Sequence, residues 1–571
     1  MRSQKRRCRF RSPSVTSIGC GRHGGSIEGK GGHAEQARKK KSESPGKLAQ
    51  VTPRLSCVGV HVFAHWLDQQ HAFDPVVAQL TQAVEAYKQT HPGNDFALLP
   101  HREQTLLHRF QALFFAPLLG IDRLTEFDTR EHPLGTLLGR GYQSGTLHQF
   151  LGQRERVGAA EALMPALVPE QVGQIIYVDG HMIASWSRQS MHKGTITMLG
   201  RIMAGSQAVI AHDEAGQAVF VVYYPPDMHL STVIVAYCQK VAEATGGALF
   251  VIDRAVNAVA LARAVNDQGL GLLCRLDDNE HDGLESFAAT LVDTLEDGTR
   301  VYSGPWKEPR PDDPRHFVIA QPPEDKTLVY WGTPKVEDAL ETNQWPRVYR
   351  ERNEMQEHRF KRMNDHGALK TNYGRKKMVG PDRHQQRKRE KLDQSLEAAH
   401  QRVDKKAEAL KAHQGKRAES ESKGHGKRLE QRQRALVAVE KDLKDAQNNH
   451  AKLTAQASAL GPPQERADRD FRKQTMMTFR TLLLENALMA FMAMLCEHLH
   501  TKVSLDCIVR ILFERSGARM ETSSQVVYWV NTAGLSLAYR RLLTEVVDGL
   551  GGMDLRHQGK PIRVCLKDMP P

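Results

Sequence analysis

The sequence predicts an α/β core flanked by long helical regions. Short β-prone runs bounded by glycine alternate with helix-period segments between residues 171 and 385. Beyond them lies a stretch rich in Lys, Glu, Gln, Ala and Leu with almost no aromatic residues, a composition typical of charged helices. A chain of 571 residues has room for several domains, and its 40% hydrophobic content suffices for sizeable cores.

The charge balance favours a polyanionic partner. Lys and Arg number 79 against 66 Asp and Glu, which gives a net charge of +13. Nucleic acid is the first candidate, and a soluble protein with basic tails is the simpler alternative. The eight cysteines form no Cys-x-x-Cys pair, which indicates reduced thiols in a cytosolic protein. The longest apolar run, 487–496, is too short for a membrane helix, so we expect a soluble cytoplasmic protein with no membrane partner.

The N-terminal third divides into a tail and a helical region. Residues 1–56 are rich in Arg, Lys, Ser and Gly, and such a segment is expected to be disordered. Residues 57–170 show helical spacing and form a candidate DNA-binding region. Its predicted helices span 73–90, 103–119 and 134–151. The glycine-bounded turn before Ser144 resembles the entry to a helix-turn-helix, although an ordinary packing element would look the same.

The segment from 171 to about 278 predicts the central sheet. It contains a strand ending at Asp179, a hairpin at 208–224, a helix at 232–245, a strand ending at Asp253, a helix at 258–266 and a strand at 270–276. The order β-β-β-α-β-α-β matches a ribonuclease-H-like core. Residues 280–342 then predict a β-rich insertion. Its short β runs lie at 299–302, 316–320 and 327–331.

The rest of the chain is predicted to be mainly helical. Residues 386–460 indicate a charged helical hairpin or coiled coil with its turn at 420–426, and its heptads are too poorly kept to imply an oligomer. The C-terminal region, 461–571, is expected to contain mostly helices, with a final strand. Its predicted elements are buried helices at 479–499 and 503–513 and a strand at 562–566.

Asp179 and Asp253 are the residues that point to chemistry. Each ends an apolar β-prone run, and ligands bind at the carboxyl ends of strands in open α/β sheets. Two such Asp residues, with a Glu from a later helix, could hold two divalent metals for phosphodiester chemistry. Oxygen ligands suit Mg²⁺ or Mn²⁺. The structural alternatives are a turn cap for Asp179 and an ion pair with Arg254 for Asp253.

Together these parts resemble the DDE transposases of insertion sequences. The resemblance lies in the order of Asp179-Gly-His, Asp253-Arg-Ala-Val-Asn, a β-rich insertion and the basic run at 349–361. In that family two Asp and one Glu hold two Mg²⁺ ions, which implies Asp179, Asp253 and Glu357 here. Glu357 precedes Phe360 by three residues, as in the family. Arg352 lies five residues before Glu357, one more than usual, so Glu354 remains an alternative.

The resemblance and the basic runs also indicate candidate residues for contacts with DNA. By resemblance, Tyr349, Arg352 and Lys361 contact phosphates near the cut. Arg375, Lys376 and Lys377 form a basic run suited to binding phosphates. Trp331 in the insertion is a candidate for stacking on a flipped base, with a place in a β core as the alternative.

The function that the resemblance implies is DNA transposition. Such an enzyme binds the terminal inverted repeats of a mobile element, cuts DNA with a metal-activated water and joins the 3′-OH to target DNA. It acts as a homodimer on two DNA ends, at the nucleoid of a prokaryotic cytoplasm. One alternative is a ribonuclease-H-like nuclease or resolvase, which cuts without joining. The other is a non-catalytic DNA-binding scaffold from a decayed element.

Overall fold

The computed structural model describes most of the chain. The described residues are 50–92, 103–129, 133–157, 159–185, 190–196, 200–254, 258–308, 310, 312–371, 373, 377–423 and 426–569. The expected disordered tail lies outside these ranges up to residue 49. Arg375 and Lys376 also lie outside them, and for Lys377 only the backbone is described.

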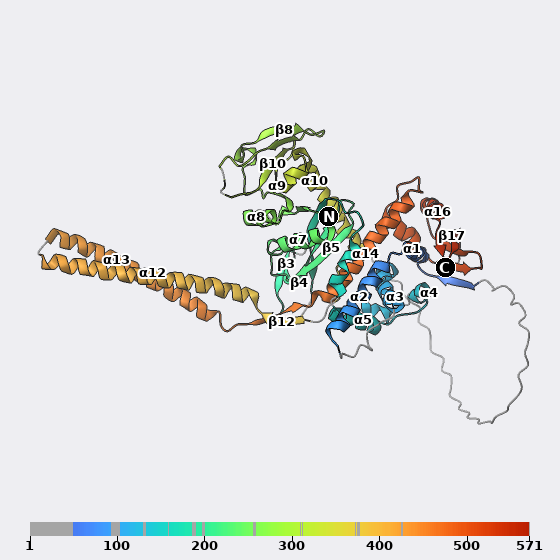
Figure 1. The fold of residues 1–571 in the computed structure, drawn as a ribbon, viewed down its shortest axis with the longest axis horizontal. Helices are drawn as coiled ribbons and strands as arrows, with labels where there is room; N and C mark the ends of the chain where they lie inside the picture. The colour runs from blue at the N-terminus through green and yellow to red at the C-terminus, as the bar shows by residue number, and fades with distance from the viewer. Residues whose placement is uncertain are drawn as a thin grey trace, which may run out of the picture. The chain divides into compact units, whose positions relative to one another are not determined.

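A mixed sheet with crossover helices forms the centre of the fold (Figure 1). Its strands are, in spatial order, β5 (Ala218–Tyr224), β4 (Arg201–His212), β2 (Ile175–Ala184), β6 (Leu249–Ile252) and β7 (Gly271–Arg275). The first three pair antiparallel and the last three pair parallel. Parallel neighbours require crossovers, which α7 (Ile234–Thr245) and α8 (Val259–Asp267) provide. The expected α/β architecture is therefore confirmed.

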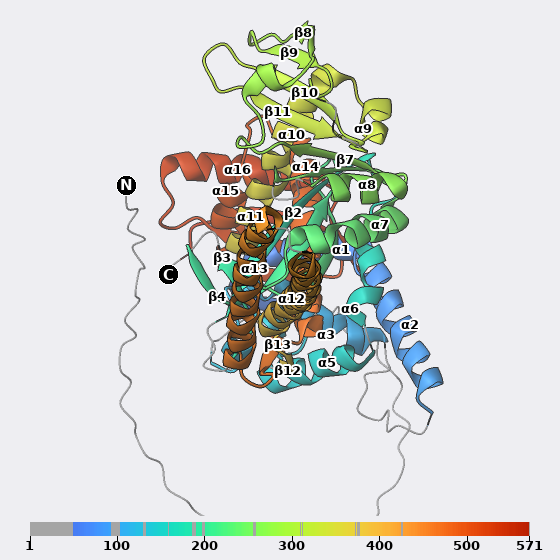
Figure 2. The ribbon, with the colours of Figure 1, turned by 90° about the vertical axis from the view of Figure 1, so that its left-hand side faces the viewer.

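The β-rich insertion extends this sheet. Its strands are β8 (Thr290–Thr294), β9 (Arg300–Ser303), β10 (His316–Gln321) and β11 (Leu328–Gly332). Figure 2 shows β11, β10, β9 and β8 following β7 in turn. β11 pairs antiparallel with β7, so the insertion shares the hydrophobic core of the central sheet. β8 was not predicted, because Leu291 and Val292 are exposed and its apolar residues show no buried face.

The N-terminal and C-terminal helices share one core. The N-terminal helices are α1 (Val58–Gln69), α2 (Asp74–Thr90), α3 (Glu103–Phe115), α4 (Leu134–Leu138), α5 (Ser144–Val157) and α6 (Ala159–Ala162). They gather with β5 around α14 (Phe471–Cys496), where Phe110, Phe479 and Phe491 are fully buried together. The predicted regions 57–170 and 461–571 therefore pack as one body. Local sequence patterns contain no signal for contacts between segments so far apart.

α14 is long and apolar enough to span a membrane by composition alone. A little over half (56%) of its most apolar window is buried inside the protein. Arg480 and Glu485 lie in the middle of the helix and are buried as well. These features are those of a core helix and are consistent with a soluble protein.

The C-terminal region contains a second sheet beside its helices, and only the last long strand of this sheet was predicted. Its strands are β1 (Gln50–Leu55), β14 (Gly517–Glu521), β15 (Val526–Asn531), β17 (Lys560–Lys567) and β16 (Arg556–His557), with α15 (Leu505–Ile508), the π-helical η11 (Val509–Phe513) and α16 (Leu537–Gly552) beside them. The predicted final strand is present as β17. The predicted disorder is wrong for β1, because this strand pairs with β14 near the other end of the chain.

The helical hairpin consists of α12 (Arg383–Ser422) and α13 (Gly426–Ala459), which pack along each other. At its root, β12 (Lys377–Pro381) pairs with β13 (Glu465–Arg469). The less exposed residues of α12 recur at alternating steps of three and four, as in a coiled-coil seam. Polar residues occupy several seam positions, and Lys406 pairs with Asp442 across the seam. The heptads are unclear in the sequence for this reason.

The remaining short elements complete the chain. They are β3 (Lys193–Ile196), α9 (Pro334–Ala339) and the 3-10 turns η2 (Pro117–Leu119), η3 (Leu124–Phe127), η4 (Met164–Leu167), η6 (Leu230–Thr232), η8 (Gly283–Ser286) and η9 (Thr342–Gln344). β3 pairs with the beginning of β4 and so lies at the edge of the central sheet. This edge faces the root of the hairpin, because Met191 forms a bridge with Ala467 of β13.

Candidate functional site

The two predicted Asp residues lie on neighbouring strands. Asp253 directly follows β6, whereas the predicted strand end at Asp179 is wrong, because β2 continues to Ala184 and Asp179 lies where its parallel pairing with β6 stops. In the parallel pair of β2 and β6, Val178 is opposite Ile252, so Asp179 and Asp253 come next to each other. Their side chains are 21% and 42% exposed. Both line one cavity of about 780 Å³. The topology thus brings two carboxylates together at the carboxyl edge of the parallel strands.

Each carboxylate is oriented by the next backbone amide. The Gly180 N–H donates to Asp179 Oδ1 at 2.7 Å, and the Arg254 N–H donates to Asp253 Oδ1 at 2.8 Å. The guanidinium of Arg254 lies 4.0 Å from Asp277, so it is not the ion-pair partner of Asp253. In each carboxylate, Oδ1 therefore accepts a hydrogen bond from the backbone amide of the following residue.

A three-part helix crosses the sheet beside these carboxylates. It consists of α10 (Trp345–Arg352), the π-helical η10 (Asn353–His358) and α11 (Arg359–His366). Trp345 is fully buried and anchors its beginning. The Tyr177 hydroxyl of β2 donates to Glu351 at 3.0 Å, and the Phe360 ring packs on His181 of β2 at 5.2 Å. The helix is therefore held along β2 on both sides of Asp179.

Arg352 lies between the two carboxylates. Its Nη1 is 3.6 Å from Asp179 Oδ2, and its Nη2 is 3.7 Å from Asp253 Oδ1. The Tyr349 hydroxyl donates to Asp253 Oδ1 at 3.4 Å. Arg352 is only 9% exposed, so this guanidinium partly neutralises two carboxylates in a shielded place. The structure thus brings Tyr349 and Arg352 to the Asp pair.

The π turn explains the unusual spacing before Glu357. A π turn has i→i+5 hydrogen bonds and is wider than an α turn, so residues five apart lie closer to one face than they do in an α-helix. The turn η10 begins directly after Arg352 and contains Glu357. Glu354, two residues after Arg352, falls on the other side of the helix. The five-residue spacing from Arg352 is therefore compatible with Glu357 as the third carboxylate.

The electrostatics link Glu357 to the Asp pair. Burial raises the pKa of Asp179 to about 6, and the nearby Asp253 and Glu357 charges contribute to this rise. Arg352 and the Gly180 hydrogen bond act in the opposite direction. A carboxylate cluster with an opposed charge suits a divalent cation, and its oxygen donors fit Mg²⁺ or Mn²⁺. Asp179, Asp253 and Glu357 are the residues that could hold it.

A second cluster with metal-ligand residues is an ion network. His192, Asp227 and Asp468 offer ligand atoms within 4.8 Å of one another. However, Arg383 donates to Asp227 at 2.7 Å and to Asp468 at 2.9 Å. The Arg383 N–H also donates to His192 Nε2, so His192 Nδ1 donates to Asp468. Both ring nitrogens of His192 already form hydrogen bonds, and the Arg383 guanidinium supplies the positive charge that a metal ion would bring. We call Arg383, Asp227, Asp468 and His192 the root clasp.

Sequence reasoning missed the contact that fixes the site helix to the core. Glu485 of α14 is 2% exposed and lies 3.6 Å from Arg359 Nη1 and 2.8 Å from Arg362 Nε. Both arginines belong to α11. A single Glu in an apolar helix requires a buried partner, and that requirement was the available signal. The ion pairs hold α11 against α14.

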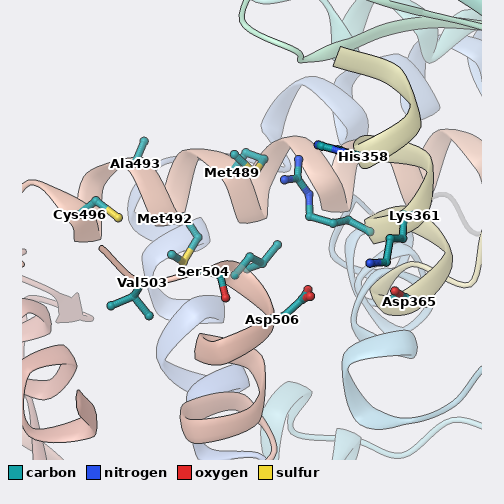
Figure 3. A pocket seen from close by; sticks show the side chains of 12 residues that line it. His358, Lys361, Asp365, Met489, Met492, Ala493, Cys496, Val503, Ser504 and Asp506 are labelled. Atoms are coloured by element: carbon teal, nitrogen blue, oxygen red, sulfur yellow. The ribbon is translucent and has the colours of Figure 1, made fainter. Parts of the chain in front are cut away.

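Two of the predicted DNA contacts lie elsewhere. Lys361 is exposed and lines a different cavity of about 530 Å³, where Figure 3 shows it with Met489 and Met492. Trp331 is fully buried in β11, between β7 and β10. The expectation that Trp331 stacks on a DNA base is wrong for this structure, because the side chain is fully buried in the hydrophobic core of the sheet. Its alternative, a place in the β core, is what the structure has.

Comparison with known proteins adds no assignment. No protein-family model matches the chain, and no curated protein matches it. The argument for a function therefore depends on the site itself. Its strongest part is the group formed by Asp179, Asp253, Arg352 and Glu357.

Proposed function

We propose that the protein is a DDE-type transposase that cuts and joins DNA at the ends of an insertion sequence. The observation that carries the proposal is that Asp179 and Asp253, on the adjacent parallel strands β2 and β6, line one cavity with Arg352 between their carboxylates. The strand order β5-β4-β2-β6-β7, with its antiparallel and parallel halves, also supports a ribonuclease-H-like core. The net charge of +13 suits a DNA substrate.

The residues of the site have different roles in the proposed reaction. Asp179, Asp253 and Glu357 would hold two Mg²⁺ or Mn²⁺ ions, which activate the attacking oxygen and stabilise the leaving oxygen in an in-line displacement. Arg352 has several N–H donors that fit a phosphate oxygen as well as a carboxylate. It partly neutralises the Asp pair in the free protein and would contact the scissile phosphate when DNA is bound. Tyr349 orients Asp253 through its hydroxyl.

The biological setting follows from the same proposal. The substrates are the terminal inverted repeats of the element and a target DNA. Two ends must be held together, so the active form is a homodimer, located at the nucleoid of a prokaryotic cytoplasm. A ribonuclease-H-like nuclease or resolvase would use the same carboxylates. It differs in cutting DNA without joining strands.

The test is cleavage and joining of plasmid DNA that carries the ends of the element, with Mn²⁺ present. We compare the wild type with Asp179→Asn, Asp253→Asn, Glu357→Gln and the matched control Glu354→Gln. We expect the first three variants to lose at least about 1,000-fold in cutting while they still bind DNA, and Glu354→Gln to remain active.

Three results would contradict parts of the proposal. Normal cutting by either Asp variant would show that the Asp pair is not the catalytic site. Cutting without joined products would select the nuclease or resolvase. A wild type that binds DNA and never cuts would leave the non-catalytic scaffold as the better account.

A further inference from the structure

The cavity that holds the Asp pair continues to the root of the helical hairpin. It is lined by Asp179 and Asp253 and also by His384 and Arg387 of α12 and Arg466 of β13. Lys193 of β3 lines it as well. A ligand that enters this cavity can therefore contact the carboxylates and the hairpin root at once.

The hairpin root is fixed to the catalytic sheet. Arg383 of the root clasp binds Asp227, in the segment after β5, and Asp468 of β13. The side chain of Arg466 pairs with Asp382, which also caps α12 by accepting from the His384 N–H. Backbone hydrogen bonds join Ala467 to Ser190 and His192. The position of the first turns of α12 relative to the Asp pair is therefore defined by many contacts.

Positive charge is concentrated at this root. The first nine residues of α12 contain Arg383, Arg387, Lys388, Arg389 and Lys391 against Glu390 alone. Beyond Lys391, basic and acidic residues of α12 are equal in number. The long helix is thus basic where it meets the cavity and balanced along the rest of its length.

The basic residues share one face of the helix. His384, Arg387, Lys388 and Lys391 are spaced by three and four residues, so they lie on one stripe. The four side chains are exposed. Among the described residues, Lys388 and Lys391 have no acidic partner within ion-pair distance, whereas Arg387 pairs with Asp227. We call these four residues the root stripe. It spans about 10 Å along the helix, close to the rise of three base pairs.

We propose that the root stripe binds the sugar-phosphate backbone of the DNA next to the bond that the carboxylate site cuts. This inference rests on the proposed function for its position near the cut. The charge, exposure and spacing of the stripe suit phosphates that follow one another along a strand. Two residues of the stripe, His384 and Arg387, line the same cavity as Asp179 and Asp253.

A second copy of the chain is the competing occupant. Among the described residues of the hairpin, Val437 is a lone large apolar side chain with high exposure. A stable protein interface needs a larger apolar centre than this residue offers. Four aligned cationic or polar side chains beside a cavity are better matched to a polyanion.

The first test measures DNA affinity of the full-length protein. The probe is a fluorescein-labelled 40-base-pair duplex of random sequence, followed by anisotropy from 50 to 300 mM KCl. The root variant is Lys388→Glu with Lys391→Glu. The matched control is Lys405→Glu with Lys411→Glu, two exposed lysines further along the same helix with the same change of charge. Circular dichroism checks that both variants are folded.

We expect the root variant to weaken binding at least about tenfold at 100 mM KCl. The slope of log Kd against log salt should fall in magnitude by about two, because two phosphate contacts are lost. The control variant should change the affinity less than about twofold. Equal losses in both variants, or no loss in either, would overturn the proposal. A change of oligomeric state in light scattering with unchanged DNA binding would assign the stripe to a second copy.

The second test locates the bound DNA. A photo-crosslinker is attached to the cysteine of the Lys391→Cys variant, in which the three carboxylates are unchanged. It is activated after the variant has bound DNA that carries the cutting site. Crosslinks should gather near the new strand end, and an even spread along the duplex would contradict the placement. The two proposals fail separately. If the wild type never cuts but the root variant alone loses binding, the root stripe remains a DNA-binding surface and the transposase proposal falls.

Discussion

Arg352 and Glu357 stand five residues apart across the π turn η10, and their charges shift the pKa of Asp179 in opposite directions. In a regular α-helix the same pair would need a spacing of four to share a face. The chain therefore contains one residue more than a regular helix requires. π turns of this kind occur frequently at functional sites.

Removing the extra residue should be tolerated. Deletion of the exposed Asn353 should convert the π turn to an α turn and leave Arg352 and the Glu on one face. We expect Mn²⁺-dependent cutting to stay within about tenfold of the wild type. Insertion of one Ala after Asn353 is the matched control, and it should abolish cutting, because it rotates the Glu away. An inactive deletion variant with normal circular dichroism would show that the π turn itself is required.

Asp179 should make the stability of the metal-free protein depend on pH. Its pKa rises from its ordinary value of 3.8 to about 6, chiefly through burial. The folded protein therefore holds a proton that the unfolded chain has released. Stability should be greatest below pH 3.8, fall as the pH rises to about 6, and stay level above that.

Asp179→Asn should remove this pH-dependent loss. At pH 7.5 in EDTA, we expect the variant to gain about 2 kcal/mol in the free energy of unfolding by urea, because the buried charge is gone. At pH 3.5 the variant and the wild type should agree. A gain of the same size at both pH values would point to packing instead of ionisation.

Arg352 should compete with divalent cations for the Asp pair. Arg352→Met leaves the two carboxylates without their shared guanidinium, so the melting temperature in EDTA should fall. Addition of Mn²⁺ should then raise the melting temperature more than it does in the wild type. Arg350→Met, on the exposed side of α10, is the control and should change neither value. A smaller Mn²⁺ effect in Arg352→Met would mean that the arginine supports cation binding.

The root clasp should stabilise the base of the hairpin. Arg383 is 26% exposed, and its partners Asp227 and Asp468 are 10% and 16% exposed. Arg383→Met leaves two shielded carboxylates without a counter-charge and should cost about 3 kcal/mol, with faster proteolysis near β12 and β13. Lys406→Met removes an exposed pair with Asp442 and should cost less than about 1 kcal/mol. Similar losses in both variants would show that the clasp contributes no more than a surface pair.

The sequence predicted the features that depend on local pattern. Asp179 and Asp253 could be placed at one sheet edge because apolar runs and glycines define the strands around them. Trp331 was misjudged, because an aromatic residue in a β run looks the same whether it is buried or exposed. The seam of the hairpin was hidden because Lys406 and other polar residues occupy heptad positions.

Contacts between distant segments could not be predicted in the same way. The Glu485 ion pairs, the root clasp and the π turn each depend on which helices meet in space. Glu357 illustrates the limit. Its spacing from Arg352 argued against it in the sequence, and only the helix geometry reconciles the two.

The pairing of β1 with β14 has a consequence for how the protein is made. β1 leaves the ribosome long before its partner β14 is synthesised. Until then β1 has no strand to join, and the C-terminal sheet lacks its edge. An unpaired edge is a site for association with other chains. Synthesis of β14 is therefore the event that protects β1, and a product that stops before residue 517 leaves β1 without its partner strand.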